Sequence, residues 1–285
     1  MADLKAETVL ITGANRGIGL EIVKQLVSSK SPPARIFATC RQPSAAQELQ
    51  KLSAEHCAVQ VIELDVSDPA SIKCAAEAVE ATICTTGLNL LINNAGINSF
   101  AILETLTAEE MMAAYKTNVV GPLLVTKVMA GMIWILETSV SNPYLMISNW
   151  PEYYLLKAFL PSLKKAAQAL DMEGMSCNRA AVINITSLVG SIELSRENFL
   201  RAPMYPYRIS KAALNMASLC LSEDLKQYQI LCTAIHPGWV QTDMGTMKAP
   251  LTVTYSVSSV LKVLASLSQN DAGKYLDWEG KAIPW

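Results

Sequence analysis

The sequence predicts a single α/β domain, residues 1–285, built on a doubly wound, mostly parallel sheet. Short apolar segments alternate with amphipathic helical segments along the chain. The strand-like segments are continuously apolar, which is typical of parallel strands buried on both faces. A glycine-rich turn joins the first strand to the first helix, and no internal repeat marks a second domain.

The elements are expected in the order that this fold requires. Residues 8–12 are the first predicted strand, and the next helix has an apolar face of Leu20, Ile22, Val23 and Leu26. Further strands are predicted at 35–40, 58–64, 88–92, 181–185, 231–235 and 274–276. Helices are predicted at 45–52, 69–83, 207–228 and 253–267, the second opened by Asp68. Another helix begins at a capping box, with Thr107 at the N-cap and Glu110 at N3.

Composition excludes several classes of function. The net charge is -2, so the chain lacks the positive surface that nucleic acids or anionic membranes attract. Seven cysteines are scattered without paired spacing, which indicates a reducing compartment rather than disulfides or a zinc site. Only two histidines are present, so no metal centre is expected. The N-terminal residues lack signal-peptide architecture, and we expect a cytoplasmic protein.

The turn Thr12–Gly19 lies between the first predicted strand and the first predicted helix. In a Rossmann-like architecture this is the place where a dinucleotide binds. Its glycines let the backbone approach a pyrophosphate, whose charge a helix N-terminus favours. A purely structural turn is the alternative, but the strand–turn–helix context favours a phosphate site. The expected contacts are Gly13, Asn15, Arg16, Gly17, Ile18 and Gly19.

The end of the second predicted strand indicates which dinucleotide binds. An acid there would bind the ribose 2′-hydroxyl of NAD, whereas arginine accommodates the 2′-phosphate of NADP. The strand ends at Cys40-Arg41 with no acid, and Arg16 can converge on the same place. Two guanidiniums without a carboxylate predict NADP(H), the alternative being two solvated surface arginines.

Further cofactor contacts are predicted at the carboxyl ends of the third and fourth strands, where ligands bind in open α/β sheets. These residues are Asp65, Val66, Asn93, Ala95 and Gly96.

Tyr207 and Lys211 lie four residues apart and therefore on one helix face, twenty residues after Ser187. An ammonium about 4 Å from a phenol can lower the phenol pKa from about 10 to about 7. This pair is therefore an adequate acid/base device, and a serine hydroxyl can polarise a carbonyl beside it. Tyr205 lacks such a partner, because Ile209 stands four residues later.

Taken together, these motifs resemble the short-chain dehydrogenases/reductases. TGANRGIG, Asp65, NNAG, Asn118, Ser187, Tyr-x-x-x-Lys and His236-Pro237-Gly238 occur in that family's order. The stretches NVVGPLL and LVGSIELS and the tail YLDWEGKAIPW look like the carbonyl reductases of the sniffer and C-factor type.

The resemblance implies a role for each matching residue. Tyr207 would give a proton to the carbonyl oxygen, and Lys211 would lower its pKa and hold the nicotinamide ribose. Ser187 would orient the substrate, and Asn118 would hold a water that links Lys211 to solvent. The residues expected beside the nicotinamide are Pro237, Gly238, Val240 and Thr242. Residues 193–206 would form a substrate wall, and residues 241–250 a lid.

Residues 128–157 do not fit this pattern. Joining Lys127 directly to Ala158 restores an uninterrupted helical spacing, so we interpret these 30 residues as an insertion within a helix. An in-frame retained intron and a genuine loop remain alternatives. A membrane span is not expected, because Pro122 and Lys127 interrupt the apolar window. The family's homodimer would be opposed by the insertion.

The predicted function is NADPH-dependent transfer of a hydride to the carbonyl of aldehydes, ketones or quinones. The alternative is a catalytically impaired, splice-variant-like form that only binds dinucleotide or acts in signalling.

Overall fold

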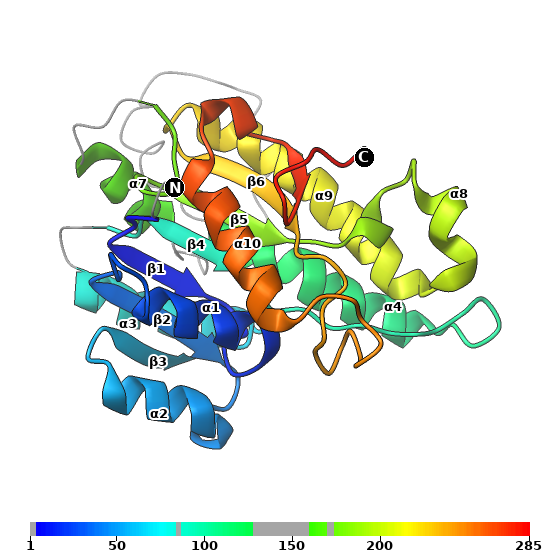
Figure 1. The fold of residues 1–285 in the computed structure, drawn as a ribbon, viewed down its shortest axis with the longest axis horizontal. Coiled ribbons are helices and arrows are strands. Elements are labelled where there is room, and N and C mark those ends of the chain that lie inside the picture. The colour runs from blue at the N-terminus through cyan, green and yellow to red at the C-terminus, as the bar shows by residue number, and fades with distance from the viewer. Residues whose placement is uncertain (1–3, 84–86, 128–159, 170–173) are drawn as a thin grey trace, which may run out of the picture.

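The computed structural model describes residues 4–83, 87–127, 160–169 and 174–285. The predicted insertion at 128–157 lies outside these residues. The described part of the chain forms a seven-stranded sheet in the order β3-β2-β1-β4-β5-β6-β7, with every neighbouring pair parallel (Figure 1). The strands are β1 Thr8–Ile11, β2 Arg35–Cys40, β3 Val59–Glu63, β4 Leu90–Asn93, β5 Ala181–Ile185, β6 Leu231–His236 and β7 Tyr275–Asp277. The predicted doubly wound fold is confirmed.

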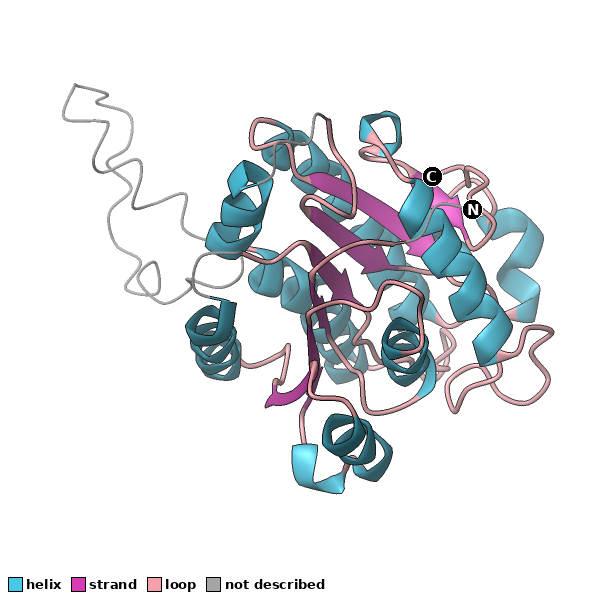
Figure 2. Cartoon of the chain, turned by 60° about the vertical axis from the view of Figure 1, so that its left-hand side comes forward, coloured by secondary structure: helices cyan, strands magenta, loops and turns pink. Residues whose placement is uncertain are grey.

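Successive strand residues face opposite layers, as the alternation of a β-strand requires. Val9 and Ile11 contact one hydrophobic cluster, and Leu10 between them contacts the other. Helices α1 Gly17–Val27, α2 Gln47–Glu55 and α10 Val253–Ser266 cover the first face. Helices α3 Pro69–Ile83, α5 Gly121–Thr126, α7 Leu160–Ala169 and α9 Tyr205–Lys226 cover the second. Figure 2 shows the sheet between these helical layers.

The predicted capping box is half right. Thr107, the N-cap of α4 Ala108–Tyr115, accepts a hydrogen bond from the Glu110 backbone N–H at 3.2 Å. The Glu110 carboxylate, however, accepts from Ser99 Oγ at 3.0 Å instead of the N-cap backbone. The Glu110 carboxylate is therefore bonded to the loop before α4, whereas in a complete capping box it would accept from the N-cap backbone N–H.

Two irregular regions adjoin the carboxyl edge of the sheet. A π-helical turn, Lys116–Val120, joins α4 to α5. The predicted substrate wall at 193–206 contains α8 Ser195–Asn198 and a single turn, Phe199–Arg201. No described helix has the length and apolarity needed to cross a bilayer.

Candidate active site

The glycine turn is fastened to the end of β4. Thr12 Oγ1 accepts hydrogen bonds from the backbone N–H groups of Asn94 and Ala95, each at 3.0 Å. Asn94 Nδ2 donates in return to the carbonyls of Thr12 and Gly13. A Cβ at Gly19 would lie 2.4 Å from the Gly13 carbonyl, so no larger residue fits there. These bonds fix the turn at the switch point between β1 and β4.

The N-terminus of α1 suits an anion. Its N-cap is Arg16, whose side chain makes no capping bond, and the first turn holds no acidic residue. The N-termini of α4 and α10, in contrast, are capped by Thr107 and Thr252. Because the first N–H groups of a helix lack intrahelical partners, an uncapped end can bind a pyrophosphate.

No acid follows β2 directly, as predicted, but the fold brings a carboxylate near each of the two arginines. Arg16 Nη1 donates to Asp243 Oδ2 at 2.8 Å, with the two side chains 69% and 76% exposed. Arg41 is exposed at the end of β2. Burial of the Asp65 carboxyl acts to raise its pKa, but bonds from Ser67 and the charges of Arg41 and Lys116 outweigh burial and lower it. Asp65 was expected at this edge, whereas the sequence concealed Asp243 as the partner of Arg16, because it follows a different strand.

The remaining predicted cofactor residues lie along the same edge, with one qualification. Asn93 turns its side chain into the core, donating to Asn184 Oδ1 at 2.8 Å and Thr126 Oγ1 at 3.1 Å. Only its backbone is available to a ligand. The segment after β6 crosses the glycine turn, since a Cβ on Gly17 would lie 3.4 Å from Thr242 Cγ2.

Tyr207, Ser187 and Lys211 come together where β5 meets α9. The Ser187 hydroxyl lies close enough to the Tyr207 phenol to counteract the rise in its pKa that burial causes. Lys211 Nζ donates to the Ile185 carbonyl at 2.8 Å and lies 5.7 Å from the centre of the Tyr207 ring. The arrangement brings a phenol, a hydroxyl and a buried amine to one place.

Asn118 lies within the π-helical turn and joins this group to the end of β4. Its Oδ1 accepts from Ile97 N at 2.8 Å, and its Nδ2 donates to the Ile97 carbonyl and to Ser210 Oγ. Ser210 Oγ donates to the Tyr207 carbonyl at 2.8 Å. A Cβ on Gly96 would lie 3.2 Å from Asn118 Oδ1 and 3.7 Å from Lys211 Nζ. All four predicted catalytic residues are therefore brought together.

Burial controls the charge of both titratable groups. It raises the pKa of Tyr207 to about 12, with the hydrogen bond to Ser187 acting in the opposite direction. It lowers the pKa of Lys211 to about 8. The expected fall of the tyrosine pKa toward 7 is thus not what this geometry gives. Tyr207 is a protonated phenol at neutral pH, which is the state that a proton donor needs.

Residues outside the predicted set also support the site. Asn215 Oδ1 accepts from Thr186 Oγ1 at 2.6 Å, and the Tyr275 hydroxyl donates to the Ser187 carbonyl at 2.6 Å. Asn215 could have been found, because it stands four residues after Lys211 on the same helix face. Tyr275 gave no signal, since β7 reads as a short apolar strand. Tyr205, which lacked a lysine partner, packs edge-on against Phe199.

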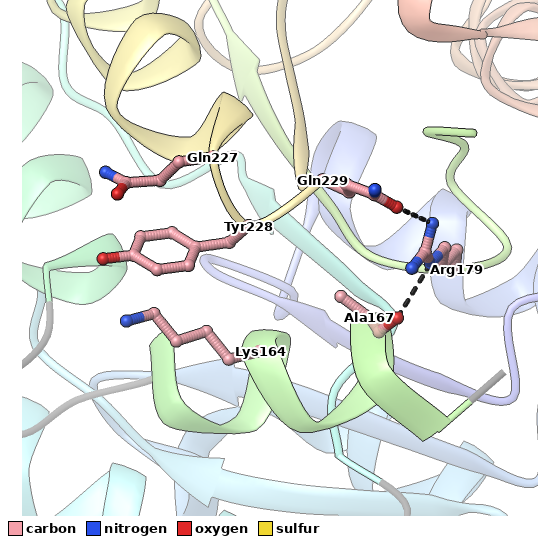
Figure 3. A pocket seen from close by; sticks show the side chains of 6 residues that line it. All are labelled: Lys164, Ala167, Arg179, Gln227, Tyr228 and Gln229. Atoms are coloured by element: carbon pink, nitrogen blue, oxygen red, sulfur yellow. Dashed lines mark hydrogen bonds between the residues drawn. The ribbon is translucent and has the colours of Figure 1, made fainter. Parts of the chain in front are cut away.

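A separate hollow of about 250 Å³ lies at the opposite, amino-terminal edge of β5 and β6 (Figure 3). Arg179 there donates to the Ala167 carbonyl and to Gln229. Lys164 Nζ lies 3.5 Å from the centre of the Tyr228 ring. Because Arg179 is engaged by hydrogen bonds and Lys164 by the face of the Tyr228 ring, we place the chemistry at the carboxyl edge. The described residues contain no group of His, Cys, Asp and Glu side chains that could hold a metal ion.

Comparison with known proteins agrees with the family resemblance that the sequence motifs indicate. The profile of the family described as short chain dehydrogenase matches residues 7–139 and 155–250. The chain is similar to an NADPH-bound carbonyl reductase from chicken fatty liver, with 43% identity, a TM-score of 0.87 and coverage of 100% of this chain and 96% of that one. It is also similar to the carbonyl reductase Sniffer of Drosophila melanogaster, with 34% identity, a TM-score of 0.83 and coverage of 98% and 100%. The C-signal of Myxococcus xanthus is 30% identical over 73% of this chain and 99% of its own length.

Proposed function

The chain belongs to the short chain dehydrogenases, a family of oxidoreductases, and on that premise we propose that it is an NADPH-dependent carbonyl reductase. Its substrates are aldehydes, ketones or quinones, and its compartment is the cytoplasm. The observation that carries the proposal is the placement of the Lys211 amine, bound to the Ile185 carbonyl, 5.7 Å from the centre of the Tyr207 ring, with the Ser187 hydroxyl beside that phenol.

The residues present fit the cofactor. The uncapped N-terminus of α1 binds the pyrophosphate, while Arg16 at that N-cap and Arg41 directly after β2 bind the 2′-phosphate. Ala95, Gly96 and the segment Pro237–Thr242 line the nicotinamide end. When bound, NADPH supplies the hydride.

The side chains supply the proton and the orientation. Ser187 Oγ donates a hydrogen bond to the substrate carbonyl and polarises it, and Tyr207 gives its phenolic proton to the same oxygen. The phenolate that remains is stabilised by the Lys211 ammonium. Asn118 holds the Ile97 backbone beside Lys211, where a water can return the proton from solvent.

The test is oxidation of NADPH by the purified full-length chain, followed by absorbance, over a panel of quinones, aldehydes and ketones. Turnover that Tyr207→Phe abolishes supports the proposal. Tight NADPH binding without turnover of any carbonyl would instead support a dinucleotide-binding or signalling protein, a reading that the similarity to C-signal favours.

A further inference from the structure

Ser187 lies where the chain leaves β5, so the orientation of its backbone depends on hydrogen bonds outside the strand. Its backbone is extended, with φ -155° and ψ 145°, and the single turn Leu188–Gly190 follows directly. Thr186 N donates to the Ile235 carbonyl at 2.8 Å, which ties the preceding residue to β6. The direction of the Ser187 hydroxyl therefore depends on what holds the Ser187 carbonyl.

Two donors hold that carbonyl. One is the Gly190 backbone N–H at 2.8 Å, within the turn itself. The other is the Tyr275 hydroxyl at 2.6 Å, which comes from β7, 88 residues further along the chain. The turn is tied to α9 through Asn215 Nδ2, which donates to the Gly190 carbonyl at 3.3 Å. The bond from Tyr275 is the one that ties the Ser187 carbonyl directly to the sheet, because β7 pairs with β6.

Tyr275 is itself held rigidly. Its side chain is among the largest fully buried ones, and its ring stacks on Trp285 with centroids 5.4 Å apart. The Trp285 carbonyl accepts from Glu193 N at 2.9 Å, which joins this stack to the predicted substrate wall. Asn215 lies beside the same phenol and accepts a hydrogen bond from Thr186 Oγ1 at 2.6 Å. The Tyr275 phenol is close enough to Tyr207 for the two to interact electrostatically.

We propose that Tyr275 is a positioning residue for carbonyl reduction, which acts by holding the Ser187 carbonyl so that the Ser187 hydroxyl meets Tyr207 and the substrate. This inference rests on the proposed function. It assigns to β7 a part in the chemistry, although β7 carries no group that touches the substrate.

The conservative variant Tyr275→Phe removes only the hydroxyl. The Ser187 carbonyl keeps its bond from Gly190, so no acceptor is left unpaired and the fold is retained. We expect kcat to fall about tenfold, the effect of losing one hydrogen bond of ordinary strength. The Kd for NADPH, measured by cofactor fluorescence, should change by less than about twofold, since Tyr275 does not adjoin the glycine turn. Tyr255→Phe is the matched control, because Tyr255 is a tyrosine 54% exposed on α10, and it should leave kcat unchanged.

A double-mutant cycle separates positioning from general loss of stability. If Tyr275 acts through the Ser187 hydroxyl, Tyr275→Phe should have almost no further effect on kcat in a Ser187→Ala background. Trp285→Ala, which removes the stacking partner, should lower kcat less and should also lose its effect in that background. The inference would be overturned if Tyr275→Phe left kcat unchanged. It would also be overturned if the double variant lost a further tenfold in kcat relative to Ser187→Ala alone. If Ser187→Ala and Tyr207→Phe themselves leave turnover intact, the proposed function fails instead.

Discussion

At the scale of single residues, burial determines which protonation states the site offers. Tyr207 and Lys211 lie close together, yet burial raises the pKa of the phenol and lowers that of the amine. Both shifts have one physical cause, because an apolar environment disfavours the charged form of either group. The site therefore holds a neutral phenol and an amine that is easily deprotonated.

The pH dependence of reduction follows from these two values. Reduction needs Tyr207 protonated, which holds below about pH 12, and Lys211 charged, which holds below about pH 8. We therefore expect log kcat/KM to be level at neutral pH and to fall as pH rises through about 8. The Lys211→Arg variant keeps its positive charge at that pH, so its log kcat/KM should not fall near pH 8, even if its kcat/KM is lower than that of the wild type. A wild-type profile that stays level to pH 10 would show that the charge on Lys211 is not required.

The proton donor can be tested against a neighbouring tyrosine. Tyr207→Phe should lower kcat by at least about a hundredfold, because general acid catalysis typically contributes that much. NADPH binding, measured by fluorescence, should stay within about threefold of wild type. Tyr205→Phe should be mild, since its ring contacts Phe199 and lies outside the Ser187–Lys211 group. Equal losses in the two variants would mean that the catalytic tyrosine is wrongly assigned.

Cofactor choice also depends on individual charges. Arg16 already has a carboxylate partner in Asp243, so we expect Arg41 to contribute more to binding of a 2′-phosphate. Arg41→Asp should weaken NADPH binding about tenfold to a hundredfold, the range for a charge-assisted bond, while NADH binding is kept or improved. Arg35→Asp makes the same charge change at the other end of β2 and is the control. Equal affinity of the wild-type protein for both cofactors would contradict the expected preference.

At the scale of elements, Gly190 is where two catalytic segments meet. A Cβ on Gly190 would lie 2.8 Å from the Lys211 backbone carbon and 3.0 Å from Lys211 Cβ. Gly190→Ala must therefore separate the turn after Ser187 from α9, at a cost of about 1–3 kcal/mol. We expect a melting temperature lower by several degrees and a markedly lower kcat, with NADPH affinity kept because the glycine turn follows a different strand. A stable variant with full kcat would show that the two segments do not need this close approach.

The elements also show where sequence reasoning succeeds. The strand at 181–185 and the helix at 69–83 have the predicted bounds, the first because its apolar run is continuous and the second because Asp68 accepts bonds from its first N–H groups. Helix α9 begins two residues earlier than predicted, since Pro206 stands in its first turn and favours a helix start there. The π-helical turn around Asn118 was missed, because it spans only Lys116–Val120, which is too short a segment for hydrophobic periodicity to reveal a change of helix type.

Sequence reasoning also predicted only part of the candidate site. Residues close together in sequence, such as Tyr207 and Lys211, could be predicted from spacing alone. Pairs joined only by the fold could not: Asp243 reaches Arg16, and Tyr275 reaches Ser187, across many intervening residues. The inward turn of Asn93 likewise depends on its sheet neighbour Asn184.

At the scale of the whole molecule, the interpretation of 128–157 as an insertion makes α5 and α7 two parts of one helix. Both contribute to the hydrophobic cluster that also contains α3, with Val125 from the first and Leu163 from the second. Without residues 128–157, Ala158 follows Lys127, so every later residue moves forward by 30 (157 − 127). The buried residues Ser162, Leu163, Ala166 and Ala167 then fall 7 and 11 positions after Val125 and Thr126. This is the spacing of one continuous helix face.

The pairing of helices on the outer surface also concerns the whole molecule. Helices α4 and α9 lie against each other and expose Met112, Tyr115, Ile209, Met216 and Leu219. The family resemblance implies that these helices build a homodimer interface, continued by the helix that 128–157 would interrupt. A homodimer is therefore our expectation for the chain without residues 128–157, which sedimentation can test.

Deletion of residues 128–157 is the decisive change at this scale. It should join α5 to α7 as one helix, so that the last carbonyls of α5 and the first N–H groups of α7 become mutual partners. Together with the shorter connection, this should raise stability by on the order of 2 kcal/mol, or about 5 °C in melting temperature, and keep or increase NADPH-dependent turnover. Deletion of 128–159 is the matched control. It removes two further residues, turns the buried face by about 200°, and should therefore destabilise the fold. If the shorter deletion also unfolds the protein or abolishes turnover, residues 128–157 are an integral part of the enzyme rather than an insertion.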